Sequence, residues 1–241
     1  MKLKILLIVC SNQEKENSSS YKTAQVIKER GNEFHNVDYE ILSLRDYKIE
    51  LCKGCCACFK TGDCLIDDDM KFLKEKLLKA DHIIFITPVY AHNVTGLLKN
   101  FIDRTSNWLH IFGLLGKTSS TIVVSSSNGN VYVSEYLKKT LEFYGTIYIG
   151  NLNITVDKPR MLDDITNLRR IIDKHLSKIV NYDRENVRID DVEKQSGVFL
   201  SFKKMYTTNN HLRSHEEEIW MTDNCLRKSS FIEAYETKRG K

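Results

Sequence analysis

Five apolar runs recur along the chain and predict the strands of one sheet. They span residues 5–9, 38–44, 82–87, 120–126 and 147–154. Most of them, such as ILLIV at 5–9, are continuous rather than alternating in polarity. Continuous runs are typical of strands that are covered on both faces, as in a parallel sheet.

Amphipathic segments separate these runs and predict helices. Strands that alternate with helices favour βαβ units with right-handed crossovers. We therefore expect an α/β fold, a flavodoxin-like doubly wound five-stranded parallel sheet with helices on both faces. In such a sheet the ligand crevice lies at the carboxyl ends of the strands, near the switch in strand order. The predicted helices span residues 19–30, 69–80, 95–109, 133–145 and 162–180.

The regular alternation stops near residue 182, which predicts a domain over 1–182 and a C-terminal extension over 183–241. Residues 198–206 favour a strand or a short helix, and a polar helix follows with a loose end. We expect Trp220 to be exposed and to mark a contact with a neighbouring subunit. Cys10 is expected to be a core thiol and Cys225 a surface thiol.

Charge and hydropathy narrow the class of protein. The chain has 36 basic and 32 acidic residues, a net charge of +4, and no basic block that would mark a nucleic-acid or membrane surface. The opening MKLKILLIVCSN is typical of a buried strand rather than a signal peptide. No window approaches the length of a membrane helix, so we expect a cytoplasmic protein. In that reducing compartment, clustered cysteines favour metal binding or redox chemistry.

The polar loop after the first strand holds Ser11 and the run Ser18, Ser19 and Ser20 before a helix. Hydroxyls and free N–H groups at a helix N-terminus favour an anion such as a phosphate. An ordinary serine N-cap in a solvated loop is the alternative. The loop lacks the Walker lysine and the glycine-rich dinucleotide pattern, which argues against a nucleoside triphosphatase and a Rossmann dehydrogenase.

Two further loops follow the third and fourth strands. Pro88 fixes the chain as it leaves the sheet, Tyr90 offers a flat face, Asn93 offers an amide and Thr95 is placed to cap the next helix. The segment SSSNGN at 125–130 is small and polar, which allows close approach of its backbone to a planar ligand. Together the three loops predict a crevice at one edge of the sheet.

Five of the seven cysteines lie within thirteen residues. Cys52, Cys55, Cys58 and Cys64 have the spacing C-x2-C-x2-C-x5-C, and Cys56 is an extra thiol. The opening of this pattern is similar to the loop that wraps a 4Fe-4S cluster in bacterial ferredoxins. A zinc site and unliganded or redox-active thiols are the alternatives. Asp67 to Asp69 follow and are expected to cap a helix.

The segments PVYAHNVTGLLKNFIDR and CKGCCACFKTGDCLIDDDM, with the serine loop, resemble the NADPH-dependent FMN reductase and iron-sulfur flavoprotein group of the flavodoxin-like superfamily over residues 1–180. The resemblance implies FMN, with its phosphate in the serine loop and its ring between the other two loops. The residues that it implies for FMN are Ser11, Ser18, Ser19, Ser20, Pro88, Val89, Tyr90, Asn93, Ser125, Ser126, Ser127, Asn128 and Gly129.

The chain departs from this group at two places. Residues 10–13, Cys-Ser-Asn-Gln, replace a Gly-Ser-Pro-Arg type opening, so Lys15 or Lys22 is the expected charge partner of the phosphate. Ala91 and His92 stand where the group more often has an aromatic residue and a glycine, which affects stacking on the flavin ring.

The resemblance implies an FMN-dependent NAD(P)H oxidoreductase that reduces a small acceptor such as a quinone, a flavin or a similar electrophile. In this interpretation Tyr90 or His92 either donates a proton to the acceptor or only shapes the loop. One alternative is an iron-sulfur flavoprotein that carries FMN and a 4Fe-4S cluster on Cys52, Cys55, Cys58 and Cys64, and passes electrons to a partner protein. A flavin-free metal or thiol sensor is a third.

The same resemblance implies a homodimer or homotetramer. Lys99, Asp103 and Arg104 lie on a helix that often forms subunit contacts in the group, and a solvated helix face is the alternative. Neither a nucleic acid nor a membrane is expected as a partner.

Overall fold

A computed structural model describes residues 2–31, 33, 36–156, 165–208, 215–222 and 225–239. Five parallel strands form one sheet in the order β2-β1-β3-β4-β5, which confirms the flavodoxin-like α/β prediction. Strand order switches direction between β1 and β3, as doubly wound sheets do. The strands are β1 Leu3–Val9, β2 Val37–Ser43, β3 His82–Pro88, β4 Thr118–Ser125 and β5 Ile147–Thr155.

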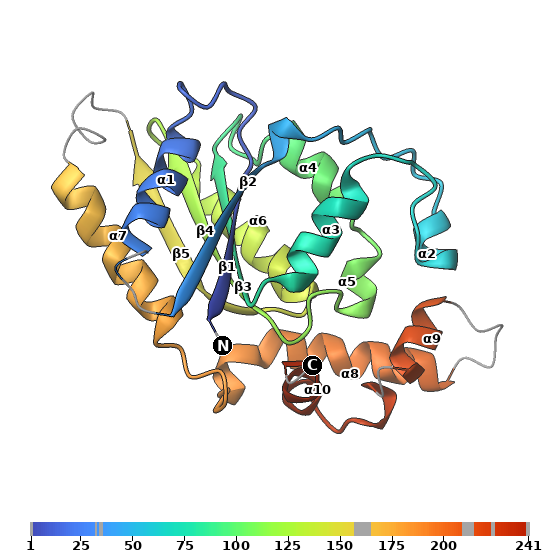
Figure 1. The fold of residues 1–241 in the computed structure, drawn as a ribbon. Helices are drawn as coiled ribbons and strands as arrows, with labels where there is room; N and C mark the ends of the chain where they lie inside the picture. Colours follow the sequence, from blue (N-terminus) through green and yellow to red (C-terminus); the bar gives the residue numbers. More distant parts are fainter. Residues whose placement is uncertain are drawn as a thin grey trace.

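Helices cover both faces of the sheet (Figure 1). The helices α1 and α7 lie on one face, and α3, α4 and α6 lie on the other. These long helices agree with the predicted segments within a few residues, except that the segment 95–109 is divided into α4 and a short α5. The helices of this part of the chain are α1 Ser19–Gly31, α2 Ala57–Thr61, α3 Met70–Lys79, α4 Gly96–Asp103, α5 Trp108–Ile111, α6 Asn130–Phe143 and α7 Ile165–Val180.

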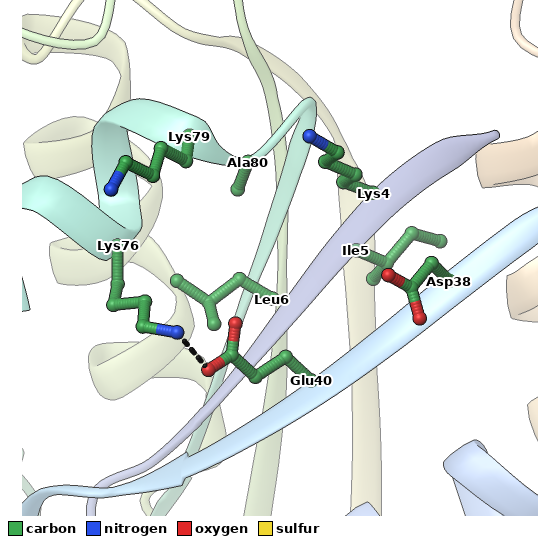
Figure 2. Close-up of a pocket in the computed structure, with 8 residues that line it drawn as sticks. All are labelled: Lys4, Ile5, Leu6, Asp38, Glu40, Lys76, Lys79 and Ala80. Atoms are coloured by element: carbon green, nitrogen blue, oxygen red, sulfur yellow. Dashed lines mark hydrogen bonds and ion pairs between the residues drawn. The ribbon is translucent and has the colours of Figure 1, made fainter. Parts of the chain in front are cut away.

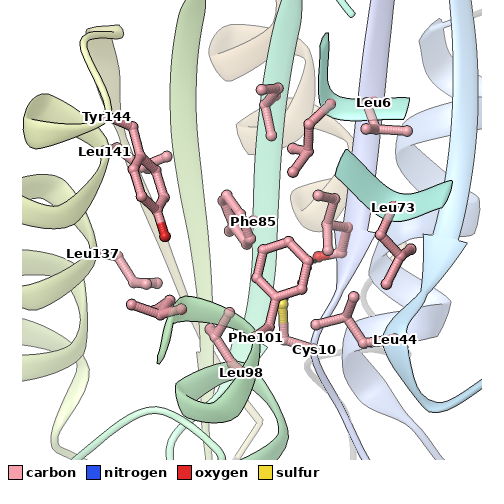
Figure 3. Packing of buried hydrophobic residues seen from close by; sticks show 14 of the residues in the cluster. Leu6, Cys10, Leu44, Leu73, Phe85, Leu98, Phe101, Leu137, Leu141 and Tyr144 are labelled. Carbon is pink, nitrogen blue, oxygen red and sulfur yellow. Dashed lines mark hydrogen bonds between the residues drawn. The ribbon is translucent and has the colours of Figure 1, made fainter. Parts of the chain in front are cut away.

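The two-sided burial of β1 explains its continuous apolar sequence. Successive side chains of a strand point to opposite faces, so Ile5 and Leu7 pack with α1 and α7 while Leu6 and Ile8 pack under α3 and α4. Figure 3 shows the second of these cores, in which Phe85 of β3 meets Phe101 of α4. The predicted core thiol Cys10 lies in the same cluster and is fully buried.

The described residues beyond 182 form a helical extension across the edge of the sheet where the strands begin (Figure 1). Gln195 donates a hydrogen bond from Nε2 to the carbonyl of Thr146, directly before β5, at 3.0 Å. The extension therefore lies opposite the loops that directly follow β1, β3 and β4. Its elements are the 3-10 turns Ile189–Val192 and Cys225–Arg227 and the helices α8 Glu193–Thr208, α9 His215–Thr222 and α10 Phe231–Arg239. Another 3-10 turn, Leu44–Asp46, follows β2 in the main domain.

An aromatic cluster joins the extension to the main domain. Trp220 is 1% exposed and packs on Phe112 and Phe199, and its indole N–H donates to the carbonyl of His110 at 3.0 Å. The expectation of an exposed Trp220 is therefore wrong, because Phe112 and aromatic side chains of α8 enclose its ring. Cys225 is also buried in the cluster, which corrects its prediction as a surface thiol.

Buried polar groups lie between β3, β4 and α7. His82 is completely buried, with Nδ1 2.8 Å from Thr118 Oγ1 and Nε2 3.0 Å from Ser120 Oγ. His175 of α7 reaches the same Ser120 hydroxyl from Nε2 at 3.2 Å. Burial lowers the pKa of His82 well below its usual value and that of His175 to about 4, so both imidazoles are neutral near pH 7.

A cavity of about 230 Å³ opens between β1, β2 and α3 (Figure 2). Its lining carries charges of both signs, and Lys76 Nζ binds Glu40 Oε1 at 2.6 Å. Lys4 of β1 and Asp38 of β2 are register partners on the same wall. The cavity lies away from the loops after the strands, and its paired charges favour a structural role.

Candidate functional site

The loops after β1, β3 and β4 contact one another at the carboxyl edge of the sheet. Thr95 donates from Oγ1 to the carbonyl of Cys10 at 2.8 Å and accepts from the N–H of Leu98 at 3.1 Å. This pair of bonds caps α4, as predicted, and ties the loop after β3 to the loop after β1. Gly129 lies against Val89, because a Cβ built on Gly129 would be 2.7 Å from Val89 Cγ1.

The serines of the first loop divide into two kinds. Ser18 directly precedes α1 and accepts the N–H of Tyr21 at 3.2 Å, so the N-cap interpretation fits it. Ser11 accepts the N–H of Gln13 at 3.2 Å, which is a turn within the loop and not a helix cap. Ser20 is 1% exposed, and among the described residues its hydroxyl has no hydrogen-bond partner. A buried hydroxyl without a partner at the start of a 13-residue helix fits an anionic oxygen as its acceptor.

Lys15, one of the two expected charge partners of the phosphate, already has a carboxylate partner. Its Nζ lies 2.6 Å from Asp46 Oδ2, and this hydrogen bond raises the pKa of Lys15. Lys22, the other expected partner, is exposed on α1. The assignment of a lysine to the phosphate therefore stays a prediction.

A tight turn at Tyr90–Asn93 follows β3. The two residues exchange backbone hydrogen bonds of 2.9 Å in both directions. Ala91 and His92 between them have φ values of 48° and 60°, a left-handed conformation that costs a non-glycine residue about 1–2 kcal/mol. Local strain of this kind is typical of functional sites.

The same turn presents polar and aromatic groups. Tyr90 is 42% exposed, and the ring of His92 lies 5.9 Å from that of Tyr132 on α6. Asn93 is exposed, and its side-chain carbonyl accepts the N–H of Val94 at 2.8 Å, which leaves the amide N–H groups to donate. These groups are placed where a planar ligand at the strand ends would meet them.

The loop after β4 contributes two further buried polar atoms. Ser125 Oγ and Asn130 Oδ1 are buried and have no hydrogen-bond partner within the described part of the chain. Ser126, Ser127 and Asn128 between them are exposed. With Ser20, these atoms give two of the three loops donors and acceptors that are unsatisfied within the described residues, which fits a polar ligand such as FMN.

The five clustered cysteines line one cavity of about 60 Å³. The short helix α2, which the sequence did not predict, lies between Cys56 and Gly62. Both flanking residues are in the left-handed region, with φ of 56° and 84°. The buried Arg104 and the ring of Phe59 line the same cavity. The thiols on this wall are Cys52, Cys55, Cys56, Cys58 and Cys64.

These five cysteines are free thiols in the structure. Partial burial raises the pKa of Cys58, which keeps that group protonated near pH 7. Among the described residues, no three Cys, His, Asp or Glu side chains converge as ligands of a metal ion. The five thiols thus have the chemistry of ligands for a soft metal. Their sulfur atoms, however, are not arranged as a preformed metal site.

Hydrogen bonds close the base of the cysteine loop. Asn100 of α4 accepts the N–H of Cys52 at 3.1 Å and donates to the carbonyls of Ile49 and Glu50. Arg104, one turn further on, donates to the same Glu50 carbonyl at 2.7 Å and binds Asp68. The two alternatives for Arg104, a solvated face and a subunit contact, are both incorrect because it is 2% exposed and paired within the chain.

The aspartates after the cysteines mainly accept hydrogen bonds from the backbone at the start of the cysteine loop. Asp68 accepts the N–H of Met70 at 3.1 Å, as the capping prediction requires, and also the N–H of Glu50 at 2.9 Å. Asp69 occupies the N-cap position of α3 without a side-chain cap bond and accepts the N–H of Lys48 at 2.7 Å. The sequence offers one signal for this arrangement, which is the i, i+4 spacing of Asn100 on α4 and Arg104 directly after it.

Lys99 and Asp103 of the same helix form an exposed i, i+4 ion pair. Such a pair contributes little to stability. This part of the expected subunit contact stays a prediction.

The parallel sheet, its strand order and the loops at its carboxyl edge define a flavodoxin-like protein. The family of NADPH-dependent FMN reductases matches residues 3–159. The chain therefore belongs to this family, as the resemblance in the sequence implied.

Curated relatives carry the name iron-sulfur flavoprotein. One from Archaeoglobus fulgidus is 48% identical over 82 residues, which cover 34% of this chain and 38% of the relative. A second from the same organism is 35% identical over 121 residues, or 49% of this chain and 55% of the relative. The matched segments thus span less than two thirds of either relative.

Solved structures share the fold. An NADH:FMN oxidoreductase in its apo form has a TM-score of 0.54 at 22% identity, and covers 72% of this chain and 88% of its own. RosB, solved with a bound 8-demethyl-8-formylriboflavin-5'-phosphate, has a TM-score of 0.59 at 14% identity, covering 88% and 90%. The described helices include none that is long and apolar enough to span a bilayer.

Proposed function

We propose that this protein is an FMN-dependent NAD(P)H oxidoreductase that reduces a small acceptor such as a quinone, another flavin or a similar electrophile. The observation that carries the proposal is the contact between three loops at the carboxyl edge of the sheet. Two of these loops hold buried hydroxyls, at Ser20 and Ser125, that have no hydrogen-bond partner among the described residues. Family membership supports the same cofactor. When bound, FMN supplies hydride and single-electron transfer.

The side chains of the three loops would divide the binding of FMN between them. Ser20 and the N–H groups at the start of α1 would hold the phosphate, because they combine unsatisfied donors with the positive end of the helix. Tyr90 and Asn93 would orient the ring from the turn after β3. Ser125 and the backbone near Gly129 would hold its other side, where the absence of a Cβ lets the two loops approach.

FMN titration of the apo-protein tests this assignment. Replacing Ser20 by Ala is expected to raise the FMN dissociation constant about tenfold, the effect of losing one hydrogen bond to a charged group. Ser201→Ala on the exposed side of α8 is the control and should leave the constant unchanged. An unchanged constant in Ser20→Ala would remove this residue from the phosphate site.

Oxidation of NADH and NADPH in the presence of a quinone or of free FMN tests the activity. We expect saturable oxidation by the FMN-loaded protein and none by the apo-protein. Bound flavin without any oxidation of either nucleotide would overturn the reductase assignment and leave the FMN site intact.

A second candidate is an iron-sulfur flavoprotein that passes electrons to a partner protein. The observation that favours it is the lining of one cavity by five cysteines. Cys52, Cys55, Cys58 and Cys64 would hold a 4Fe-4S cluster after their side chains turn toward the cavity. Anaerobic reconstitution followed by iron and sulfide analysis tests it, with about four irons per chain expected. Negligible iron would leave the cysteines as thiols.

The assembly and location of the protein are part of the same proposal. Exposed Tyr90, Val131 and Tyr132 next to the FMN site support a subunit contact in a homodimer or homotetramer. Five free thiols in one loop support a reducing, cytoplasmic location. Light scattering of the FMN-loaded protein measures the assembly, and a monomer at high concentration would contradict it.

A further inference from the structure

The C-terminal extension reaches the cysteine loop through α9. The ring of His215, at the start of α9, lies directly over Gly62 at the end of α2, because a Cβ built on Gly62 would be 2.2 Å from His215 Nε2. A glycine is therefore needed at position 62 for two reasons. Its φ of 84° disfavours other residues, and a side chain would occupy the space of the His215 imidazole. This contact places α9 against the helix that carries Cys58.

His110 of α5 lies between the two elements. One side of its ring meets Phe59 of α2 at 5.1 Å between ring centres, and Nδ1 binds Glu216 Oε1 of α9 at 3.0 Å. Glu216 also accepts the hydroxyl of Tyr206 on α8 at 2.9 Å. Trp220 donates to the backbone carbonyl of His110, so the position of His110 is fixed by both its backbone and its side chain.

We propose that the C-terminal extension is a brace for the cysteine loop, in which Glu216 holds His110, and His110 and His215 hold α2. His110 and Glu216 are then positioning residues of the cysteine site, although neither lines the cavity. The helix α2 has five residues, too few to be stable alone, so outside contacts must fix its conformation. The family match ends at residue 159, before the extension begins.

Trypsin cleavage after Lys60 measures the opening of α2 without any cofactor. Lys60 is exposed on α2, and cleavage requires local unfolding of the helix. In Glu216→Ala we expect cleavage after Lys60 to be about fivefold faster, because a partly exposed ion pair and a hydrogen bond are lost. Cleavage after Lys22 in α1 should not change.

Glu218→Ala is the matched control, since Glu218 is exposed on the same helix. It should leave cleavage after Lys60 unchanged. If Glu216→Ala does not fold, Tyr206→Phe removes only the hydroxyl that Glu216 accepts, and a smaller acceleration is expected. Unchanged cleavage after Lys60 in the folded variants would overturn the brace.

A double variant tests whether the brace acts through His110. Phe59→Leu removes the ring that His110 touches on α2, and Glu216→Ala removes the anchor on α9. If both act through His110, the double variant should be cleaved no faster than the faster single variant, whereas multiplied rates would indicate independent effects and overturn the linkage.

The consequence for metal binding rests on the proposed cluster. After anaerobic reconstitution, Glu216→Ala should retain less iron per chain than the wild type at equal FMN content. A wild type without iron would contradict the cluster and leave the cleavage experiment as the test of the brace. Equal iron in both proteins would show that the brace does not position the ligands.

Discussion

Arg104 and Asp68 form a buried, bidentate ion pair, with Nη1 2.5 Å from Oδ2 and Nη2 2.9 Å from Oδ1. Both side chains are completely inaccessible to solvent. The pair joins α4 to the segment after the cysteines, and the bond from Arg104 to the Glu50 carbonyl joins it to the segment before them. One guanidinium thereby closes both ends of the cysteine loop.

Removal of one member of this pair should destabilise the protein strongly. Burial raises the pKa of Asp68, but hydrogen bonds from Arg104 and from the N–H groups of Glu50 and Met70 outweigh it and lower the net pKa. Asp68→Asn leaves the guanidinium buried and unpaired, at a cost of about 3–5 kcal/mol in the free energy of unfolding. Urea unfolding at neutral pH measures this difference.

Asp67→Asn is the control for that variant, since Asp67 is the exposed neighbour of Asp68. Its free energy of unfolding should stay within about 0.5 kcal/mol of the wild type. Equal stabilities of the two variants would show that the pair closes the loop without contributing to folding.

The sheet could be predicted from the sequence, whereas the structure of the cysteine loop could not. The runs of β1 and β3 are apolar because both faces are covered, and this local signal does not depend on distant contacts. The helix α2 has no such period, and it follows Cys56, whose left-handed backbone no propensity predicts. The pairing of Arg104 with Asp68 spans 36 residues, a separation that periodicity cannot report.

In the C-terminal extension, too, contacts between distant residues could not be predicted from the sequence. The residues Glu-Glu-Glu-Ile-Trp at 216–220 predict an exposed polar helix, and the helix is present as α9. Trp220 is buried because Phe112, in a distant part of the chain, provides one wall of its pocket. For the FMN residues, the sequence predicted loops that the structure brings together, while the roles of individual residues await the binding experiments.

The buried histidines should lower the free energy of unfolding at acidic pH. The pKa of His175 is lowered to about 4 by burial and by the charge of Lys178, against about 6.5 in the unfolded chain. Below about pH 6.5 the imidazole of His175 is therefore protonated in the unfolded state but stays neutral in the folded state. The free energy of unfolding falls as the pH is lowered toward about 4. For His175 alone the loss amounts to about 2 kcal/mol at about pH 5.

Unfolding by urea at several pH values checks this effect. His175→Gln should lose about 2 kcal/mol less than the wild type between about pH 7.5 and about pH 5. His92→Gln, which changes an exposed imidazole, should retain the wild-type dependence. Parallel curves for the wild type and His175→Gln would show that the buried imidazole does not titrate in this range.

Thr95 should matter for both stability and FMN binding. Its hydroxyl caps α4 and also satisfies the carbonyl of Cys10. Thr95→Val keeps the shape but loses both bonds, which should cost about 2 kcal/mol in the free energy of unfolding. Because the bond to Cys10 joins two of the proposed FMN loops, the affinity for FMN should fall as well.

Thr207→Val, at an exposed position of α8, is the control for loss of a threonine hydroxyl. It should leave FMN affinity unchanged. If Thr95→Val lowered stability but not FMN affinity, the contact between the two loops would be structural only.

Gly129 offers the sharpest test of the contact between the loops after β3 and β4. Its φ is 85°, and an added Cβ would meet Val89 Cγ1 at 2.7 Å and His92 Cα at 3.3 Å. Gly129→Ala must therefore push the two loops apart as well as strain the backbone, at a cost of about 1–2 kcal/mol. Gly96→Ala is the matched control, because its Cβ would meet nothing within 4 Å.

If FMN lies between these loops, Gly129→Ala should weaken FMN binding about tenfold or more, whereas Gly96→Ala should bind FMN as the wild type does. Titration monitored by flavin fluorescence measures both constants, and circular dichroism confirms that each variant is folded. Weaker binding with an intact fold would locate the ring at this contact, because the substitution changes no polar group. Normal FMN affinity in a folded Gly129→Ala would mean that the loop after β4 does not touch the cofactor.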